Sequence, residues 1–207
     1  MALRQLLSSP IGKKLGMAVS GLILYAFLVL HLAGNLVLFK GDGGGSYNEY
    51  SNYLVRHPFL VPAELGLLVL FVLHVYLSIC VSRDNLRARP IGYQVRRSAG
   101  GRSWASYTML YSGLLVSAFV VLHLLHLKYA VHSNTLYELV TGSLANPVYA
   151  GSYLLAMVVL GFHLWHSCHS AFQTLGWDGQ RFRLISAALS LLLAGGFGLI
   201  PLWACLR

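Results

Sequence analysis

The chain has 207 residues, of which 57% are hydrophobic and only 10% are charged, and its mean hydropathy is +0.65. A soluble domain carries about 25% charged residues, so this composition excludes an ordinary soluble enzyme and leaves any soluble catalytic machinery to other subunits. The 15 Lys and Arg side chains outnumber the 6 Asp and Glu side chains. In so apolar a chain this excess favours a membrane surface, and not nucleic acid, as the partner.

Five apolar segments are long enough to cross a membrane, which takes roughly 20 residues of helix. In chain order they are Leu15–Phe39, Val61–Val81, Ser106–Leu127, Val148–Phe172 and Leu184–Leu206. The glycine run after the first segment is interpreted as a turn, because the Gly-Lys-Ser/Thr of a phosphate loop does not follow it. The sequence therefore predicts an all-α fold, with residues 1–207 forming a single membrane bundle of five helices.

The basic residues predict the orientation of this bundle. Eleven of them fall on one side of the membrane: Arg4, Lys13, Lys14, Arg83, Arg87, Arg89, Arg96, Arg97, Arg102, Arg181 and Arg183. Only Lys40, Arg56, Lys128 and Arg207 fall on the other. Because cytoplasmic loops are enriched in Lys and Arg, we expect a cytoplasmic N-terminus and an external C-terminus.

Seven of the nine histidines lie within the predicted spans, where ionisable residues are costly and mark functional sites. At a rise of 1.5 Å per residue, His31 and His123 lie about 6–12 Å from the outer ends of their helices. His74 lies about 10 Å from the inner end of its helix, and His163 about 13 Å from that of its own. His166 matches the depth of His74 as well as His163 does. Four helices thus place histidines at two depths.

Paired imidazoles from different helices are what a six-coordinate heme iron requires. Non-covalent b-type hemes are expected, since no Cys-x-x-Cys-His motif occurs. A zinc or copper site would usually add carboxylate or thiolate ligands at a suitable spacing, and the spans offer none. A transporter or proton channel that uses buried histidines without heme is the alternative from another functional class.

Several motifs resemble the diheme cytochrome b subunit of succinate dehydrogenase and fumarate reductase, over nearly the whole chain. The most specific runs from Phe162-His163 to the Gly176-Trp177 pair in the fourth span. Similar too are His31-Leu32-Ala33-Gly34-Asn35, His74 followed by Arg83-Asp84-Asn85, and Gly113 ten residues before His123.

The resemblance implies that His163 pairs with His74 on an inner heme b, and that His31 pairs with His123 on an outer one. His126, His166 and His169 would then be packing, propionate or quinone-site residues. It also implies a flavoprotein subunit with FAD and an iron–sulfur subunit, both on the cytoplasmic face of a bacterial inner membrane, and a higher oligomer of the complex. Electrons would pass from succinate to quinone, with menaquinone expected over ubiquinone, or in reverse during fumarate reduction.

Quinone binding is expected beside the outer heme, at the external ends of the first three spans. The candidate groups are Asn35, Tyr47, Tyr53 and His126, with Glu49 and Glu64 as proton donors. An inner site at Ser9, Lys13 or Lys14 is the alternative. The sequence departs from the family at two places: Gly161 replaces the glutamate of proton-translocating fumarate reductases, and Val55 or a neighbour replaces their acidic residue after the first span.

A second reading within electron transfer is the cytochrome b subunit of a membrane hydrogenase or formate dehydrogenase. Those subunits also use bis-histidine hemes, but they typically have four spans and a different distribution of ligands.

Overall fold

The computed structural model describes residues 9–88, 104–130 and 135–207, and every regular element in these ranges is helical. The long helices are α2 (Pro10–Asn35), α4 (Leu60–Arg87), α5 (Trp104–His123), α7 (Pro147–Thr174) and α8 (Gln180–Cys205). A 3-10 turn, η1 (Leu36–Lys40), extends α2, and a π-helical turn, η2 (Leu124–Lys128), extends α5. Two short helices, α3 (Gly45–Arg56) and α6 (Leu136–Leu144), complete the described fold.

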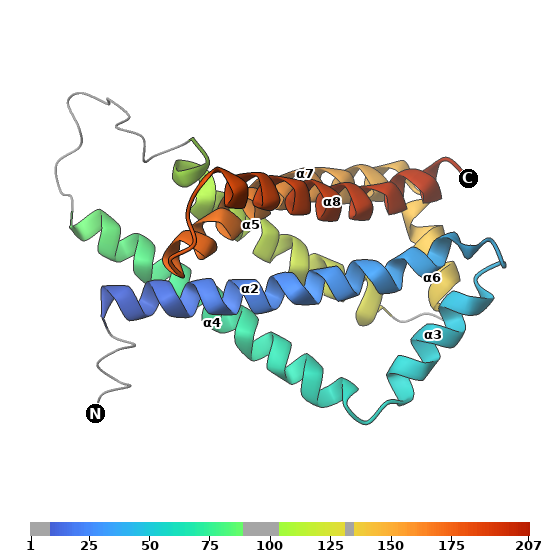
Figure 1. Cartoon of the computed structure of the whole chain (residues 1–207). Coiled ribbons are helices and arrows are strands. Elements are labelled where there is room, and N and C mark those ends of the chain that lie inside the picture. The colour runs from blue at the N-terminus through green and yellow to red at the C-terminus, as the bar shows by residue number, and fades with distance from the viewer. Residues whose placement is uncertain (1–8, 89–103, 131–134) are drawn as a thin grey trace.

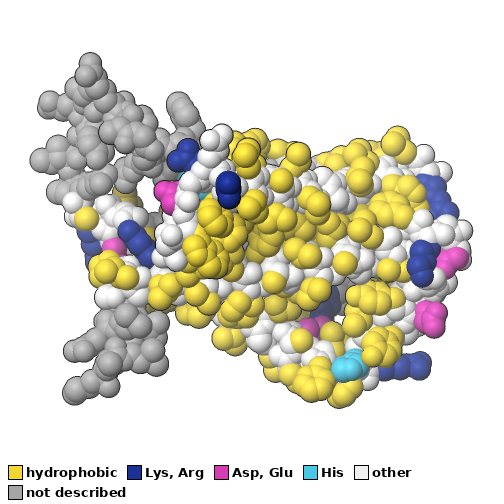
Figure 2. Space-filling model, viewed as in Figure 1, with side chains coloured by type: hydrophobic (Ala, Val, Ile, Leu, Met, Phe, Trp, Pro, Cys, Tyr) yellow, Lys and Arg dark blue, Asp and Glu magenta, His cyan; other side chains and the backbone are white. Residues whose placement is uncertain are grey.

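Five of these helices are long and apolar enough to cross a membrane, as the sequence predicts. Many large apolar side chains on them face outward, including Leu30, Val69 and Leu191. In Figure 2 hydrophobic side chains cover the middle of the molecule, and the visible charged side chains gather toward its ends. An apolar band between polar ends is the surface that a bilayer requires. The chain is therefore a membrane-embedded helical bundle.

Capping residues explain where the helices begin, and several helices are longer than the predicted spans. The Ser9 side chain accepts a hydrogen bond from the Gly12 backbone at 3.0 Å, with Pro10 in the first turn. Asn146 accepts from the Val148 backbone at 2.9 Å in the same way, again followed by a proline. Helix α4 continues to Arg87, six residues beyond the predicted end at Val81, because polar side chains need not end a helix that has left the apolar layer.

The long helices alternate in direction, so the start of α2 and the C-terminus lie at opposite ends of the bundle (Figure 1). Helix α7 packs most extensively on α8 and also contacts α2 and α5, whereas α4 packs mainly on α2. Leu32 of α2, Leu160 and Leu164 of α7 and Leu193 of α8 form one buried cluster. These contacts place α2, α7 and α8 around the centre, with α5 packed on α7 and α4 diverging from the others (Figure 1).

The short helices α3 and α6 cover one end of the bundle, where α2 and α8 finish (Figure 1). The glycine run forms the predicted turn before α3, with Gly41, Gly43 and Gly44 at positive φ. At Gly44 a side chain is excluded, because a Cβ atom would lie 2.2 Å from the Tyr137 ring. Tyr47 and Tyr137 are buried in the cluster that joins α3, α6 and α8.

Candidate functional site

The structure brings His31 and His123 together from α2 and α5. Their ring centroids are 6.0 Å apart, with an angle of 85° between the ring planes. Metal–imidazole bonds are about 2 Å long, so two rings on opposite sides of one iron have centroids roughly 6 Å apart. The observed separation is therefore the one that a bis-histidine iron needs.

Aromatic side chains surround this first pair. Phe27 stacks on the His31 ring at 5.3 Å between centroids, and Phe197 of α8 lies 5.6 Å from it. Phe119 lies 5.8 Å from His123. This lining is apolar, which suits a planar hydrophobic cofactor and keeps water away from its edge.

His74 of α4 and His163 of α7 are the histidines of the second predicted pair. His74 Nδ1 lies 3.1 Å from both Ser20 Oγ and the Met17 carbonyl oxygen. His163 Nδ1 lies 3.1 Å from Ser112 Oγ. Both serines come from neighbouring helices, α2 and α5, so each ring is held from across the bundle.

In all four histidines the ring atom that contacts a protein group is Nδ1. For the first pair the contacts are longer: His31 Nδ1 lies 3.5 Å from Asn35 Nδ2, and His123 Nδ1 lies 3.4 Å from the Tyr153 hydroxyl. Histidines that bind metals usually donate the N–H of their second ring nitrogen to an acceptor, as the serine and tyrosine oxygens allow for His74, His163 and His123. The Asn35 amide nitrogen is a donor and cannot accept from His31. In the other three histidines Nε2 is the nitrogen that would bind iron.

The donor set fits a heme and does not fit a bare metal ion. Within the described parts of the chain, no three His, Cys, Asp or Glu side chains converge to hold an ion by themselves. A zinc site needs at least three protein ligands, whereas a porphyrin supplies four of the six iron ligands and leaves two to the protein. The His31–His123 pair could supply those two, and His74 with His163 could do so for a second heme.

The quinone candidates separate into two groups in the structure. Asn35 and Tyr47 lie together, since the Tyr47 hydroxyl donates to Asn35 Oδ1 at 3.3 Å, next to His31. His126 lies in the π-helical turn, where its ring stacks on Tyr149 at 4.5 Å and its Nδ1 lies 3.3 Å from the Tyr153 hydroxyl. Both groups adjoin the His31–His123 pair.

Tyr53, Glu49 and Glu64 are placed differently. Tyr53 is 64% exposed on α3 and contacts His57, and Glu49 is exposed on the same helix. The Glu64 carboxylate accepts a hydrogen bond from the Lys128 ammonium group, an ion pair that joins α4 to the end of α5. Glu64 would have to leave Lys128 before it could donate a proton.

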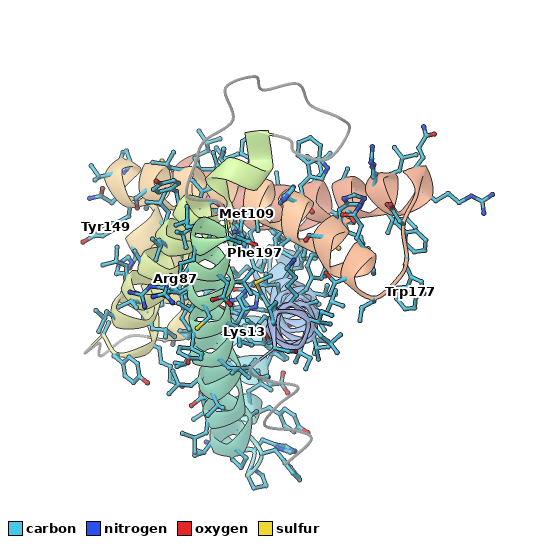
Figure 3. All side chains as sticks on the ribbon, turned by 90° about the vertical axis from the view of Figure 1, so that its left-hand side faces the viewer. Lys13, Arg87, Met109, Tyr149, Trp177 and Phe197 are labelled. Carbon is cyan, nitrogen blue, oxygen red and sulfur yellow. The ribbon has the colours of Figure 1, made fainter. Side chains whose placement is uncertain are left out.

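Two of the inner-side alternatives are engaged in structural contacts. Ser9 caps α2, and Lys13 forms an ion pair of 2.7 Å with Asp84 that joins α2 to α4. Figure 3 looks at this end of the bundle and shows Lys13 beside α4, with Arg87 nearby. Lys14 is exposed on α2. Of the eleven basic residues predicted on the inner side, five lie outside the described residues: Arg4, Arg89, Arg96, Arg97 and Arg102.

Sequence reasoning missed three residues that contact the histidines: Ser20, Ser112 and Tyr153. A signal for the serines was present, because Ser-Gly recurs in α2 and α5, each time with a histidine ten residues after the glycine. Tyr153 has no comparable signal, since a tyrosine near a helix end usually reads as an interfacial residue.

No protein-family model, curated protein or solved structure matches this chain.

Proposed function

We propose that this chain is the membrane anchor and electron-transfer subunit of a succinate:quinone oxidoreductase. In this proposal His31 and His123 hold one b-type heme, and His74 and His163 hold a second. The observation that carries it is that four different spanning helices supply two histidine pairs, each ring contacting protein through Nδ1. A heme held by two histidines would supply one-electron transfer and would not favour oxygen binding.

The partners are proposed to dock at the end of the bundle where α2 begins. Six described basic residues belong to this end, Lys13, Lys14, Arg83, Arg87, Arg181 and Arg183, against four at the other end. This asymmetry favours the cytoplasmic side for this end, and the membrane is proposed to be a bacterial inner membrane. The flavoprotein that oxidises succinate and the iron–sulfur subunit would deliver electrons first to the His74–His163 pair.

Quinone reduction is proposed at the opposite end, beside the His31–His123 pair. A quinone takes up two electrons, derived from succinate, and two protons, derived from water, to give the quinol. The side chains that can orient it or pass protons to it are Tyr47 and Asn35 on one side and His126 on the other. Burial raises the pKa of Tyr47 to about 12, so its hydroxyl stays protonated and remains a donor at neutral pH.

A visible spectrum of the purified complex, with its partners co-expressed, tests the proposal. We expect two b-type hemes per chain, both reduced by succinate and reoxidised by a menaquinone or ubiquinone analogue, the former faster. A chain that binds no heme contradicts the proposal. Heme that hydrogen or formate reduces, and succinate does not, would assign the chain to the other class of membrane cytochrome b.

Cysteine labelling in intact cells tests the orientation. Cys80, Cys168 and Cys205 are first replaced by alanine, and single cysteines are then placed at Tyr53 or Trp177. These positions are 64% and 52% exposed and lie near opposite ends of the bundle (Figures 1 and 3). A membrane-impermeant maleimide is expected to label Y53C and not W177C, and the reverse pattern contradicts the orientation.

A further inference from the structure

Two helices of this bundle carry the same short motif at the same place relative to a histidine. Helix α2 has Ser20-Gly21 before His31, and α5 has Ser112-Gly113 before His123, with ten residues from each glycine to its histidine. Each Ser-Gly pair meets a histidine of another helix: Ser20-Gly21 meets His74, and Ser112-Gly113 meets His163. The helix pairs α2–α4 and α5–α7 thus repeat one arrangement, in which the first helix supports the histidine of the second.

The serine hydroxyls are placed to accept hydrogen bonds from these histidines. Ser20 Oγ donates its single proton to a backbone carbonyl of its own helix, that of Gly16 at 2.8 Å or Met17 at 3.1 Å. Ser112 Oγ donates to the Met109 carbonyl at 3.1 Å. Since a hydroxyl has one proton and two lone pairs, each oxygen then accepts from a histidine Nδ1–H. In this arrangement Nε2 carries the lone pair for iron.

The glycines let the same two rings approach the neighbouring backbone. A Cβ atom at Gly21 would lie 2.9 Å from His74 Cε1, and one at Gly113 would lie 3.3 Å from His163 Cε1. Any larger residue at Gly21 would push the ring away from the serine beside it. Serine and glycine therefore act together, since the glycine brings the ring close and the serine sets its rotation.

We propose that Ser20-Gly21 and Ser112-Gly113 are positioning residues that orient His74 and His163 as iron ligands and strengthen their electron donation. The inference rests on the heme-binding function proposed above. It goes beyond that function by assigning the residues that make the midpoint potential of one heme differ from that of the other. A hydrogen bond accepted from Nδ1–H makes an imidazole a stronger donor, which stabilises ferric iron and lowers the midpoint potential. The His31–His123 pair has no serine in this role, because its Nδ1 atoms contact Asn35 and Tyr153.

Redox titration of the two hemes in the purified complex tests the serines. S112A is expected to make the midpoint potential of one heme more positive, and this should be the heme that is lost when His163 is replaced. S112T is expected to restore the original potential. S20A should give a smaller shift, because His74 Nδ1 keeps the Met17 carbonyl as an acceptor. The matched control is S117A on α5, whose hydroxyl bonds only to the Gly113 carbonyl of its own helix, and it should leave both potentials unchanged.

Heme content tests the glycines. G21A is expected to lower the occupancy of the same heme, and G113A to lower it less, in the order of the two Cβ contacts. G66A on α4 is the control, because no atom lies within 4 Å of a Cβ there. Unchanged potentials in S112A, or a shift confined to the other heme, would overturn this inference and leave the two-heme proposal standing. Absence of heme from the unaltered complex would instead overturn the proposed function itself.

Discussion

The two histidine pairs sit in the same bundle but are held by different kinds of contact. His74 and His163 contact serine hydroxyls at 3.1 Å, and each of those serines also bonds to its own helix. His31 and His123 have Nδ1 contacts of 3.5 and 3.4 Å, made with Asn35 and Tyr153. Those two groups also bond to other side chains, Tyr47 and His126.

This difference matches two different tasks. A hydroxyl that bonds to the backbone of its own helix does not link its histidine to other side chains, so that histidine keeps one orientation. A tyrosine shared between two histidines, or an asparagine shared with a tyrosine, connects the ligand to groups near the end of the bundle. The first arrangement suits electron transfer alone, whereas the second suits electron transfer next to a site where protons are taken up.

The largest expected effect comes from removing a ligand. H163A should reduce the heme content from two per chain to one, whereas H166A should leave both, since the proposed iron ligand is the first histidine of this helix motif. Pyridine hemochrome quantification with the reduced spectrum measures the result. Loss of heme in H166A, with H163A unaffected, would move the ligand by one helical turn and break the assignment of the second pair.

Some features of this structure follow from the sequence alone, and others do not. Apolar length and histidine depth predict five spans and two layers of histidines, because both follow from the helical rise alone. The short helices α3 and α6 escape such reasoning: neither has an apolar window of spanning length, and Tyr47 and Tyr137 are recognised as core residues only once the bundle end is formed. The roles of Ser20 and Ser112 could not be predicted, because a serine within an apolar helix ordinarily bonds to the backbone of its own helix. Whether its oxygen also accepts a hydrogen bond from another helix depends on tertiary packing.

The next largest effect is expected from replacing Tyr153, which contacts only the His31–His123 pair among the two pairs. Y153F removes the hydroxyl that lies 3.4 Å from His123 and 3.3 Å from His126 and keeps the ring that packs on Phe119. Quinone turnover should fall about fivefold, which corresponds to one hydrogen bond of about 1 kcal/mol. Steady-state quinone reduction measures this fall, and stopped-flow absorbance should show that succinate reduces the His74–His163 heme at an unaltered rate.

Y149F is the matched control for that variant. The Tyr149 ring stacks on His126, and the substitution keeps that ring. Its turnover should stay close to that of the unaltered complex. If Y153F and Y149F slow the reaction equally, or if Y153F slows electron entry as much as quinone reduction, the two pairs are not functionally distinct in the way the contacts indicate.

A smaller effect is expected at Tyr47. Y47F removes the hydroxyl that donates to Asn35 Oδ1 at 3.3 Å, one step further from the histidine than Tyr153. Turnover should fall about two- to threefold, less than in Y153F, because the remaining Asn35 amide still bonds to the His31 carbonyl oxygen at 2.8 Å. Y53F on the exposed face of the same helix should have no effect. A larger loss in Y47F than in Y153F would place the quinone on the α3 side of the pair.

The smallest effect separates a proton donor from a structural ion pair at Glu64. Its carboxylate is bonded to Lys128, so E64Q should weaken the link between α4 and the end of α5 by at most roughly 1 kcal/mol, as exposed ion pairs do. Quinone turnover should change less than in either tyrosine variant, and K128Q should reproduce that change, because both substitutions break the same pair. E49Q, on the exposed face of α3, should be indistinguishable from the unaltered complex.

A structural role makes E64Q and K128Q equivalent. If E64Q alone slows turnover, the carboxyl group donates protons to the quinone, and the proton path beside the His31–His123 pair runs along α4 instead of through Tyr153.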